Sequence, residues 1–273
     1  KIGITPTPGV ATAPAPYCYR CPYKHEYPEC GLICVDAIEE LIETQTDGKV
    51  CAFIAEPIMG AGGIIIPPQE YFKRVMKILR KHDILFIADE IQAGLGRSGK
   101  MWSHQHFGIT PDIMTVAKGL AGGIPIGVVL FKEELDLPIR HFSTFGGNLV
   151  ACASACAVLE VITEESLVSK ADEIGNYVIH QLTELSQKYE IMGDVRGKGL
   201  MIGVELVENR KTKKPASELT EQIIQRCLEK GLIIGKGGVH GNVLRITPPL
   251  IITKNQVDRF FEIFNTVLKT TTT

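Results

Sequence analysis

The chain carries two patterns of apolar and polar residues, one with the period of a helix and one with the period of a strand. Apolar positions three or four residues apart predict helices, and short apolar runs bounded by Gly, Pro or charged residues predict strands. Helices are expected at residues 35–44, 69–82, from 148 onward, 165–189, 217–230 and 255–268. Strands are expected at residues 50–55, 84–90, 112–119, 126–131, 200–207, 231–234 and 243–246. This alternation is typical of βαβ units, with a domain boundary near residue 160.

Two of the expected strands end in chemically distinctive residues. Residues 84–90 (ILFIADE) end in two acids, and residues 112–119 (DIMTVAKG) end in a lysine beside a glycine. Both runs predict buried strands. Ligands of open α/β sheets bind outside the carboxyl ends of parallel strands, so Asp89 and Lys118 are expected in one crevice. Pyridoxal phosphate needs such a pair, because a lysine forms a Schiff base with its aldehyde and an acid keeps its ring nitrogen protonated.

Ordinary structural roles compete with this interpretation. A lysine at a strand end is usually a solvated charge, and an aspartate there is often a helix cap. Lys118, however, has no carboxylate nearby in the sequence, and we expect it to be desolvated and therefore nucleophilic. Asp89 follows an apolar run in which an unpaired carboxylate would be costly to bury, and a cationic ring nitrogen would supply its partner.

The loop after Asp89 also matches two nucleotide-binding patterns. Gly94, Gly96 and Gly99 spell G-x-G-x-x-G, and residues 94–100 spell G-x-x-x-x-G-K. The first pattern should open a long helix, but no sustained apolar periodicity follows. The second should continue with Ser or Thr for magnesium, and Met101 stands there instead. Both context requirements fail, which argues against nucleotide binding.

Composition sets outer limits on function. The 273 residues, 45% of them hydrophobic, suffice for one large or two modest domains. A net charge of −2 gives no electrostatic footprint for nucleic acid, and the dense basic run at residues 209–214 is expected to be a solvated loop. Residues 142–159 carry no charge, but Gly, Asn148 and small polar residues favour a buried helix capped near Asn148 over a membrane span. Neither a nucleic-acid nor a membrane partner is therefore expected.

The eight cysteines raise the question of a metal or a disulfide framework. Four of them have the spacing C-x2-C-x8-C-x3-C, which is tighter than common zinc spacings, and whether they bind a metal is left open: Cys18, Cys21, Cys30 and Cys34. The other four fall in apolar patterns typical of small buried hydrophobes: Cys51, Cys152, Cys156 and Cys227. No secretory signal is visible, so we expect reduced thiols in a cytoplasmic protein, with an organelle as the alternative.

Six segments, in the same order along nearly the whole chain, resemble class III pyridoxal phosphate aminotransferases of fold type I. They are AEPIMGAGG (55–63), IADEIQAGLGRSG (87–99), TVAKGLAGGIPIG (115–127), HFSTFGGN (141–148), VRGKGLMIGVEL (195–206) and VLRITPPLIIT (243–253). The carboxyl-terminal third is most similar to the alanine:glyoxylate type, with 4-aminobutyrate and acetylornithine aminotransferases close behind.

This resemblance implies an α/β architecture. Residues 1–160 would form a pyridoxal phosphate-binding large domain with a mostly parallel sheet, and residues 161–273 a smaller α+β carboxyl-terminal domain. Residues 1–19 resemble the linker that follows the family's amino-terminal portion. The large domain is therefore expected to be incomplete at its amino terminus, without the Gly/Ser loop that cradles the cofactor phosphate.

The resemblance also implies roles for individual residues. Lys118 would hold the cofactor as a Schiff base and move the substrate proton, while Asp89 would pair with the ring nitrogen. Gln92 would contact the cofactor's phenolic oxygen and the substrate carboxylate, and Ile91 would pack on the ring, although a core isoleucine is compatible with that role. Thr144 would reach the cofactor phosphate of a neighbouring subunit, which implies a homodimer or larger homo-oligomer, and its alternative role is that of a turn threonine.

Substrate contacts are expected from two further residues. Arg245 is the one charge in the apolar run 243–246, where a planar guanidinium suits bidentate binding of an α-carboxylate. A surface arginine on an edge strand is the competing interpretation. Glu56 resembles the glutamate that pairs with this arginine when a substrate lacks an α-carboxylate. Arg97 is interpreted as a loop ion pair and is not assigned to the site.

The implied function is transamination from alanine, a related amine or an ω-amino acid to a 2-oxo acid such as glyoxylate or pyruvate. 4-Aminobutyrate or acetylornithine transamination is the alternative within the family. An alternative from another class is a non-catalytic fragment or assembly partner that keeps the pocket only in outline. Because cofactor residues are shared across different reactions, they do not choose among these possibilities. No metal is expected at the site.

Overall fold

The computed structural model describes residues 8–135 and 143–271 and divides the chain into two compact units. The first unit comprises Lys1–Ile58, Pro67–Leu95 and Trp102–Glu165. The second comprises Met59–Ile66, Gly96–Met101 and Ser166–Thr273. Most of the second unit thus begins at Ser166, and two short earlier segments also belong to it.

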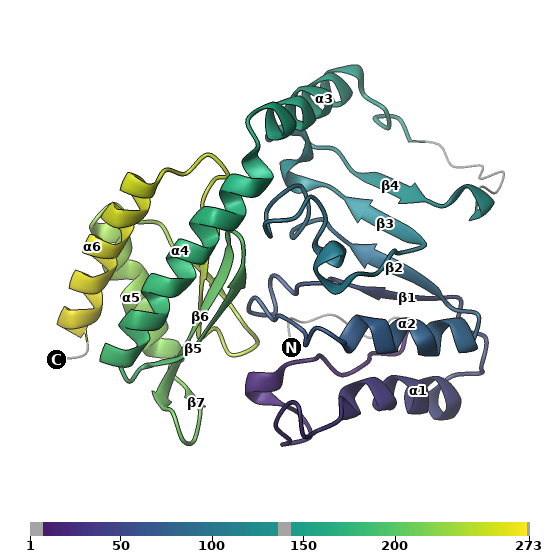
Figure 1. The fold of residues 1–273 in the computed structure, drawn as a ribbon, viewed down its shortest axis with the longest axis horizontal. Coiled ribbons are helices and arrows are strands. Elements are labelled where there is room, and N and C mark those ends of the chain that lie inside the picture. Colours follow the sequence, from purple (N-terminus) through teal and green to yellow (C-terminus); the bar gives the residue numbers. More distant parts are fainter. Residues whose placement is uncertain (1–7, 136–142, 272–273) are drawn as a thin grey trace. The chain divides into compact units, whose positions relative to one another are not determined.

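A four-stranded sheet forms the centre of the first unit (Figure 1). Its strands, in spatial order, are β1 (Ala52–Ala55), β2 (Leu85–Asp89), β3 (Ile113–Val116) and β4 (Val128–Phe131). The first three are parallel, and β4 runs antiparallel to β3. The mostly parallel sheet expected from the alternation of strands and helices is therefore present.

The helices of the first unit agree closely with the apolar periodicity. They are α1 (Ile33–Gln45), α2 (Tyr71–Lys81) and α3 (Leu149–Glu164). Short 3-10 helices accompany them at η1 (Cys18–Arg20), η2 (Ser103–Phe107), η3 (Lys118–Ala121) and η4 (Glu133–Leu135). The cap expected at Asn148 is confirmed, because its side chain accepts hydrogen bonds from the backbone N–H groups of Val150 and Ala151.

The sheet of the first unit is buried on one face and partly exposed on the other. This corrects the expectation that its strands are fully buried. Phe72 of α2 packs against Phe86 of β2 and against Phe107, with ring centroids 5.7 and 5.1 Å away. Alternate residues of a strand point to opposite faces. On the other face, Ile54 of β1 is 61% exposed and Val129 of β4 is 57% exposed. Among the described residues, the well-packed core of this unit therefore lies on the face of the sheet that contacts α2.

The strand register places two ends of the sheet side by side. Asp89, the last residue of β2, lies opposite Thr115 of β3, and the two strands run in the same direction. Lys118 follows shortly after the end of β3. The end of β2 and the start of the segment that carries Lys118 therefore lie at the same edge of the sheet, as in the crevice of an open α/β sheet.

The second unit contains an antiparallel sheet in the order β5-β6-β9-β8, with β7 paired to β6. Its strands are β5 (Met192–Lys198), β6 (Met201–Asn209), β7 (Lys214–Pro215), β8 (Gly235–Gly237) and β9 (Val243–Ile246). Its helices are α4 (Leu167–Lys188), α5 (Ser217–Glu229) and α6 (Lys254–Thr271). Apolar residues of β6 and β9 pack with Phe264 and other helix residues in one buried cluster.

In this unit one strand was predicted at the wrong position and another was not predicted. The strand expected at residues 231–234 is displaced to Gly235–Gly237, where two glycines and a lysine give no apolar signal. Strand β5 was missed, because Gly, Asp, Arg and Lys interrupt its sequence and a bulge shifts its register near Asp194. Backbone pairing to β6 and β9 forms these strands where side-chain pattern does not predict them.

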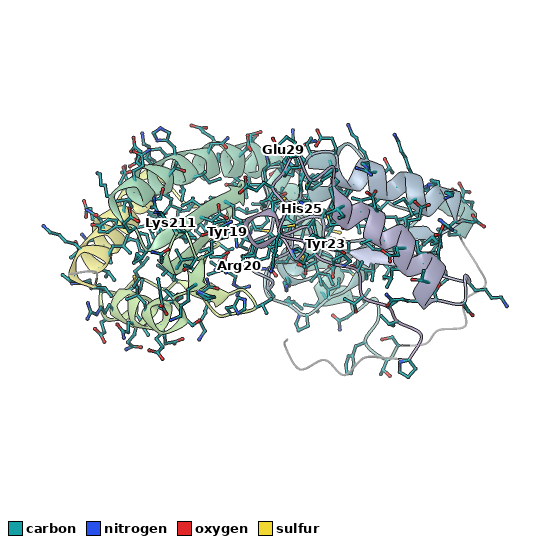
Figure 2. The ribbon with its side chains drawn as sticks, turned by 90° about the horizontal axis from the view of Figure 1, so that it is seen from below. Tyr19, Arg20, Tyr23, His25, Glu29 and Lys211 are labelled. Atoms are coloured by element: carbon teal, nitrogen blue, oxygen red, sulfur yellow. The ribbon has the colours of Figure 1, made fainter. Side chains whose placement is uncertain are left out.

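The basic run at residues 209–214 forms a turn rather than a wholly solvated loop. It joins β6 to β7, and Asn209 Oδ1 accepts hydrogen bonds from the backbone N–H groups of Lys211 and Thr212 at 2.9 and 3.1 Å. Arg210 donates to the backbone carbonyl oxygens of Glu190 and Tyr189 at 3.2 and 3.1 Å, whereas Lys211 is exposed (Figure 2). Within the described residues, no helix combines the length and apolar content that a bilayer crossing requires.

Candidate active site

The candidate site lies at the edge of the first sheet where β2 and β3 end. The ammonium Nζ of Lys118 donates to the side-chain Oε1 of Gln92 across 3.3 Å. Lys118 begins the short helix η3 and has a φ angle of 48°, a left-handed conformation that non-glycine residues rarely adopt. Backbone strain of this kind is concentrated at functional sites. The structure therefore brings together two of the residues predicted from sequence and places one in a strained conformation.

Asp89 is held by the turn that follows β2. Its Oδ1 accepts a hydrogen bond from the backbone N–H of Ile91 at 3.0 Å, in the manner of an Asx turn. The residue is half-buried. Thr115, opposite Asp89 in the register, has a buried hydroxyl with no hydrogen-bond partner among the described residues. A polar ligand at this edge would supply such a partner.

The expectation that Lys118 is desolvated is not met in this structure. Its residue is exposed, and the neighbouring Gly119 is exposed as well. The apolar residues that flank Lys118 in the sequence, such as Val116 and Leu120, are buried in the core. Sequence neighbours therefore did not predict the surroundings of the side chain, because residues next to one another on a strand or a tight turn face different directions.

A buried network beside the candidate site was not predicted from sequence. Glu90 is 1% exposed, and its carboxylate accepts hydrogen bonds from the backbone N–H and hydroxyl of Ser103 and from the backbone N–H of His104. The Nδ1 of His104 lies 2.9 Å from Glu90 Oε1. Burial alone would raise the pKa of Glu90, but the hydrogen bonds from His104 and Ser103 outweigh it and hold the pKa below its ordinary value.

This hydrogen-bond network joins the two ends of the loop that carries Gln92. The loop leaves β2 at Glu90 and returns to it at Ser103 and His104, so a single carboxylate fastens both of its ends. Gly94 lies inside this loop, and a Cβ there would come within 2.8 Å of the Glu90 carbonyl oxygen. The adjacent acids Asp89 and Glu90 thus differ in their surroundings, because one faces the candidate site and the other is buried under the loop.

Three other predicted site residues lie in the same unit. Ile91 is half-buried at the start of the turn after β2, and Glu56 is half-buried directly after β1. Thr144 is exposed in the turn that precedes α3. The structure places them without assigning their roles, which remain predictions.

Arg245 lies in the second unit, in strand β9. Its Nε is buried and has no hydrogen-bond partner, and within the described residues its guanidinium forms no ion pair. Gly203 of β6 and Gly235 of β8 lie opposite it in the register. The edge-strand alternative is wrong, because β9 lies between β6 and β8. An unpaired guanidinium among glycines is suited to binding an anion.

Arg97 has a structural environment different from the expected loop ion pair. Its Nη1 donates to the backbone carbonyl oxygens of Leu200, at 3.3 Å, and Pro248, all within the second unit. Burial lowers the pKa of this guanidinium. Arg97 therefore holds the segment 96–101 to the rest of the second unit through carbonyl groups rather than through a carboxylate.

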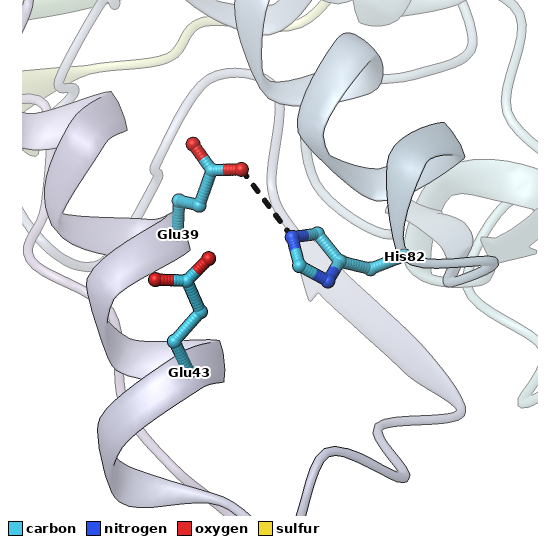
Figure 3. Close-up of side chains that lie close together, drawn as sticks. All are labelled: Glu39, Glu43 and His82. Carbon is cyan, nitrogen blue, oxygen red and sulfur yellow. Dashed lines mark hydrogen bonds and ion pairs between the residues drawn. The ribbon is translucent and has the colours of Figure 1, made fainter.

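One group among the described residues has the composition of a metal site. Glu39 and Glu43 of α1 and His82, at the end of α2, present atoms within 4.8 Å of one another (Figure 3). Glu39 Oε1 lies 3.3 Å from His82 Nε2 and also accepts from Lys81 Nζ at 2.6 Å. The lysine occupies the same carboxylate oxygen, so we interpret this group as a surface ion-pair cluster that joins α1 to α2.

The four clustered cysteines line one small cavity with His25, but no three of their sulfur atoms come within 4.8 Å of one another. Figure 2 shows His25 and Tyr23 in this segment before α1. Burial raises the pKa of Cys34 to about 11, with a further contribution from Cys18. The Cys34 thiol is therefore protonated at neutral pH.

Comparisons with known proteins agree with this arrangement. Residues 1–268 match the family model described as aminotransferase class-III. The chain is 46% identical over 250 residues to a leucine/methionine racemase of Thermococcus litoralis, covering 90% of this chain and 56% of that protein. It is 42% identical over 244 residues to alanine–glyoxylate aminotransferase 2 homolog 2, mitochondrial, of Arabidopsis thaliana, covering 88% of this chain and 51% of that protein.

Solved structures give the same result. A Bacillus anthracis aminotransferase superposes with a TM-score of 0.87 at 34% identity, covering 93% of this chain and 60% of that one. The match confirms the α/β architecture of fold type I expected from the sequence. The chain spans about half the length of the curated relatives that it matches.

Proposed function

The chain belongs to the class III aminotransferases, which depend on pyridoxal phosphate, and on that premise we propose that its protein transfers an amino group to a 2-oxo acid. One observation carries the proposal. Lys118 contacts Gln92 at the sheet edge where β2 ends in Asp89. An amine, an amide and a carboxylate at the end of neighbouring parallel strands are the groups that this cofactor requires.

The donor set fits the cofactor residue by residue. When bound, pyridoxal phosphate supplies an electrophilic carbonyl and an electron sink. Lys118 would hold it covalently and, as a free amine, would accept and return a proton at Nζ. Asp89 would accept a hydrogen bond from the ring nitrogen and so would keep that nitrogen protonated. Gln92 orients Lys118, and Ile91 packs against the ring.

The proposal also assigns roles to Thr144, toward a second copy of the chain, and to Arg245, in the second unit. Thr144 is exposed, as a residue that binds the cofactor phosphate of a neighbouring copy must be. We therefore expect a homodimer or larger homo-oligomer. Arg245 binds the substrate α-carboxylate, for which its unpaired guanidinium is available. Glu56 pairs with Arg245 when the donor lacks that group, so Glu56→Gln is expected to change the preference between α-amino acids and ω-amines.

The test of cofactor binding uses the purified protein, pyridoxal phosphate and a Lys118→Arg control. After reduction with borohydride, peptide mass spectrometry is expected to find the cofactor on Lys118 and on no residue of the variant. A colourless protein that carries no label after reduction contradicts the proposal. That outcome supports the other class of function, a non-catalytic fragment or assembly partner.

The substrates follow from the relatives only in outline. Alanine or a related amine is the proposed donor, with glyoxylate or pyruvate as acceptor, as the name of the Arabidopsis relative suggests. 4-Aminobutyrate and acetylornithine are the alternative donors. A panel of these donors with glyoxylate, pyruvate and 2-oxoglutarate distinguishes them, and no transfer from any of them would remove transamination from consideration. The expected cytoplasmic location stays a prediction.

Racemisation is a second candidate, favoured by the 46% identity to the leucine/methionine racemase. Both reactions begin with loss of the proton from the substrate Cα, and they differ in where a proton returns. Incubation with L-leucine in the absence of any 2-oxo acid, followed by chiral chromatography, separates them. Accumulation of D-leucine supports racemisation, whereas an unchanged enantiomer together with active transfer from alanine supports transamination.

A further inference from the structure

Arg245 of β9 lies beside two glycines of the neighbouring strand β8, Gly235 and Gly237, in the second unit. In the register, Arg245 of β9 is opposite Gly235 of β8, and Gly237 is the next residue of β8 on the same face. A Cβ built on Gly237 would lie 2.7 Å from Arg245 Cδ, 3.0 Å from Cγ and 3.3 Å from Nε. The aliphatic stem of Arg245 therefore occupies the space that any side chain at position 237 would need.

The glycine is not explained by backbone conformation. Gly237 does not have a positive φ angle, whereas the adjacent Gly238 has a φ of 83°. An alanine at 237 thus meets no backbone strain, and the three atoms nearest to its Cβ all belong to Arg245. Gly235 is different, because its Cβ would meet Arg245 at 3.5 to 3.6 Å, which is ordinary van der Waals contact.

The charges on this face of the sheet leave Arg245 without a counter-ion. Arg196, in the same row through Gly203, donates to Glu205 at 2.9 Å and to Asp194 at 2.5 Å. Arg245 has no such partner among the described residues, and its Nε is both buried and unpaired. A buried donor without a partner is costly, so its surroundings are suited to an anionic ligand.

We propose that Gly237 is a positioning residue, which lets Arg245 lie flat along β8 and so sets the direction in which its guanidinium binds a substrate carboxylate. The inference rests on the carboxylate-binding role proposed above for Arg245. Bidentate binding requires the plane of the guanidinium to match the plane of the carboxylate, so a displaced stem loses affinity even though the charge remains. Gly237 thereby favours donors with an α-carboxylate over amines that lack one.

The test compares three variants of the complete holoenzyme: Gly237→Ala, Gly235→Ala and Arg245→Gln. KM and kcat are measured with L-alanine, which has a carboxylate, and with benzylamine, which has none. In Gly237→Ala we expect KM for alanine to rise roughly 10- to 100-fold, the loss of a charge-assisted bidentate contact. The kcat for alanine and both constants for benzylamine are expected to change less than about twofold, and Gly235→Ala is expected to resemble the parent protein.

A crystal structure of Gly237→Ala adds a readout that does not depend on activity, and it is expected to show Arg245 in a different rotamer. Equal loss of both donors, or an unmoved Arg245 with unchanged KM, overturns the positioning role. If Arg245→Gln loses alanine selectively while Gly237→Ala does not, only this inference fails. If Arg245→Gln keeps the parent KM for alanine, the proposed carboxylate-binding role fails, and the inference fails with it.

Discussion

The ammonium of Lys118 donates to the side-chain carbonyl oxygen of Gln92 at 3.3 Å, although 25 residues separate them in the sequence. Gln92 lies on the loop after β2, and Lys118 lies on the turn after β3. The contact joins the loop and the turn at one edge of the parallel sheet. It also restrains an exposed and flexible side chain, so Gln92 limits the positions that the amine can take.

We expect Gln92→Ala to reduce kcat for the proposed transamination by roughly 10- to 100-fold, because the amine that moves the proton loses its restraint. The thermal unfolding midpoint is expected to change little, since Lys118 is exposed and Gln92 is only half-buried. Steady-state kinetics and calorimetry on the same preparations provide the measurements. A variant with parental kcat would show that this contact has no role in positioning Lys118.

Glu90 is expected to stabilise the loop that carries Gln92. In Glu90→Gln, an amide NH2 replaces a carboxylate oxygen and faces the N–H donors of Ser103 and His104. The buried mismatch is expected to cost about 2–4 kcal/mol in the free energy of unfolding. Urea denaturation measures it. Glu39→Gln, which alters a partly exposed carboxylate in a surface ion-pair cluster, is the control and is expected to change stability little.

Asp112 gives the first unit a pH-dependent stability. Its carboxylate is 3% exposed, and it accepts hydrogen bonds from Arg80 at 2.8 and 3.0 Å and from Lys132 at 2.8 Å. Burial alone would raise the pKa of Asp112, but Arg80, Lys132 and the backbone N–H of Phe86 lower it to about 2. The ordinary value is 3.8, so the folded protein holds the carboxylate ionised at pH values where the unfolded chain is protonated.

The sign of the effect follows from that order of pKa values. The contribution is fully present above about pH 4 and is lost as the pH falls through about 2. We expect roughly 1–2 kcal/mol, less than the full shift implies, because Arg80 and Lys132 are partly exposed. The free energy of unfolding measured from pH 6 to 2 should converge for the parent protein and Asp112→Asn. A gap that stays constant over this range would contradict the assignment.

The sequence pattern correctly predicted the helices and strands that bury one face and expose the other. The cap at Asn148 and the apolar periodicity of α2 were sufficient signals, since each depends on residues close together in the chain. The parallel pairing that brings Asp89 to the end of the sheet near Lys118 followed from the same reasoning. Local and global preferences agree at these positions.

The remaining features depend on contacts between distant residues. Glu90 bonds to Ser103 and His104, and nothing in an ILFIADE strand shows which of its two acids is buried. The strand at Gly235–Gly237 has no apolar pattern, because its glycines accommodate the stem of Arg245 from the neighbouring strand. The hydrogen bonds of Glu90 and the packing of the β8 glycines against Arg245 therefore could not be predicted from the sequence pattern.

Gly175 provides a test of packing within the second unit. It lies in α4, where a Cβ would come within 2.1 Å of the Gly199 carbonyl oxygen and 2.3 Å of its carbonyl carbon. Helix propensity alone predicts that Gly175→Ala stabilises by about 1 kcal/mol. Contact with backbone atoms cannot be relieved by rotating a side chain, so we expect a net destabilisation of about 2–4 kcal/mol instead. Denaturant unfolding measures the sign, with Gly127→Ala, which meets no atom within 4 Å, as the control. A more stable Gly175→Ala would show that α4 does not pack closely against the turn between β5 and β6.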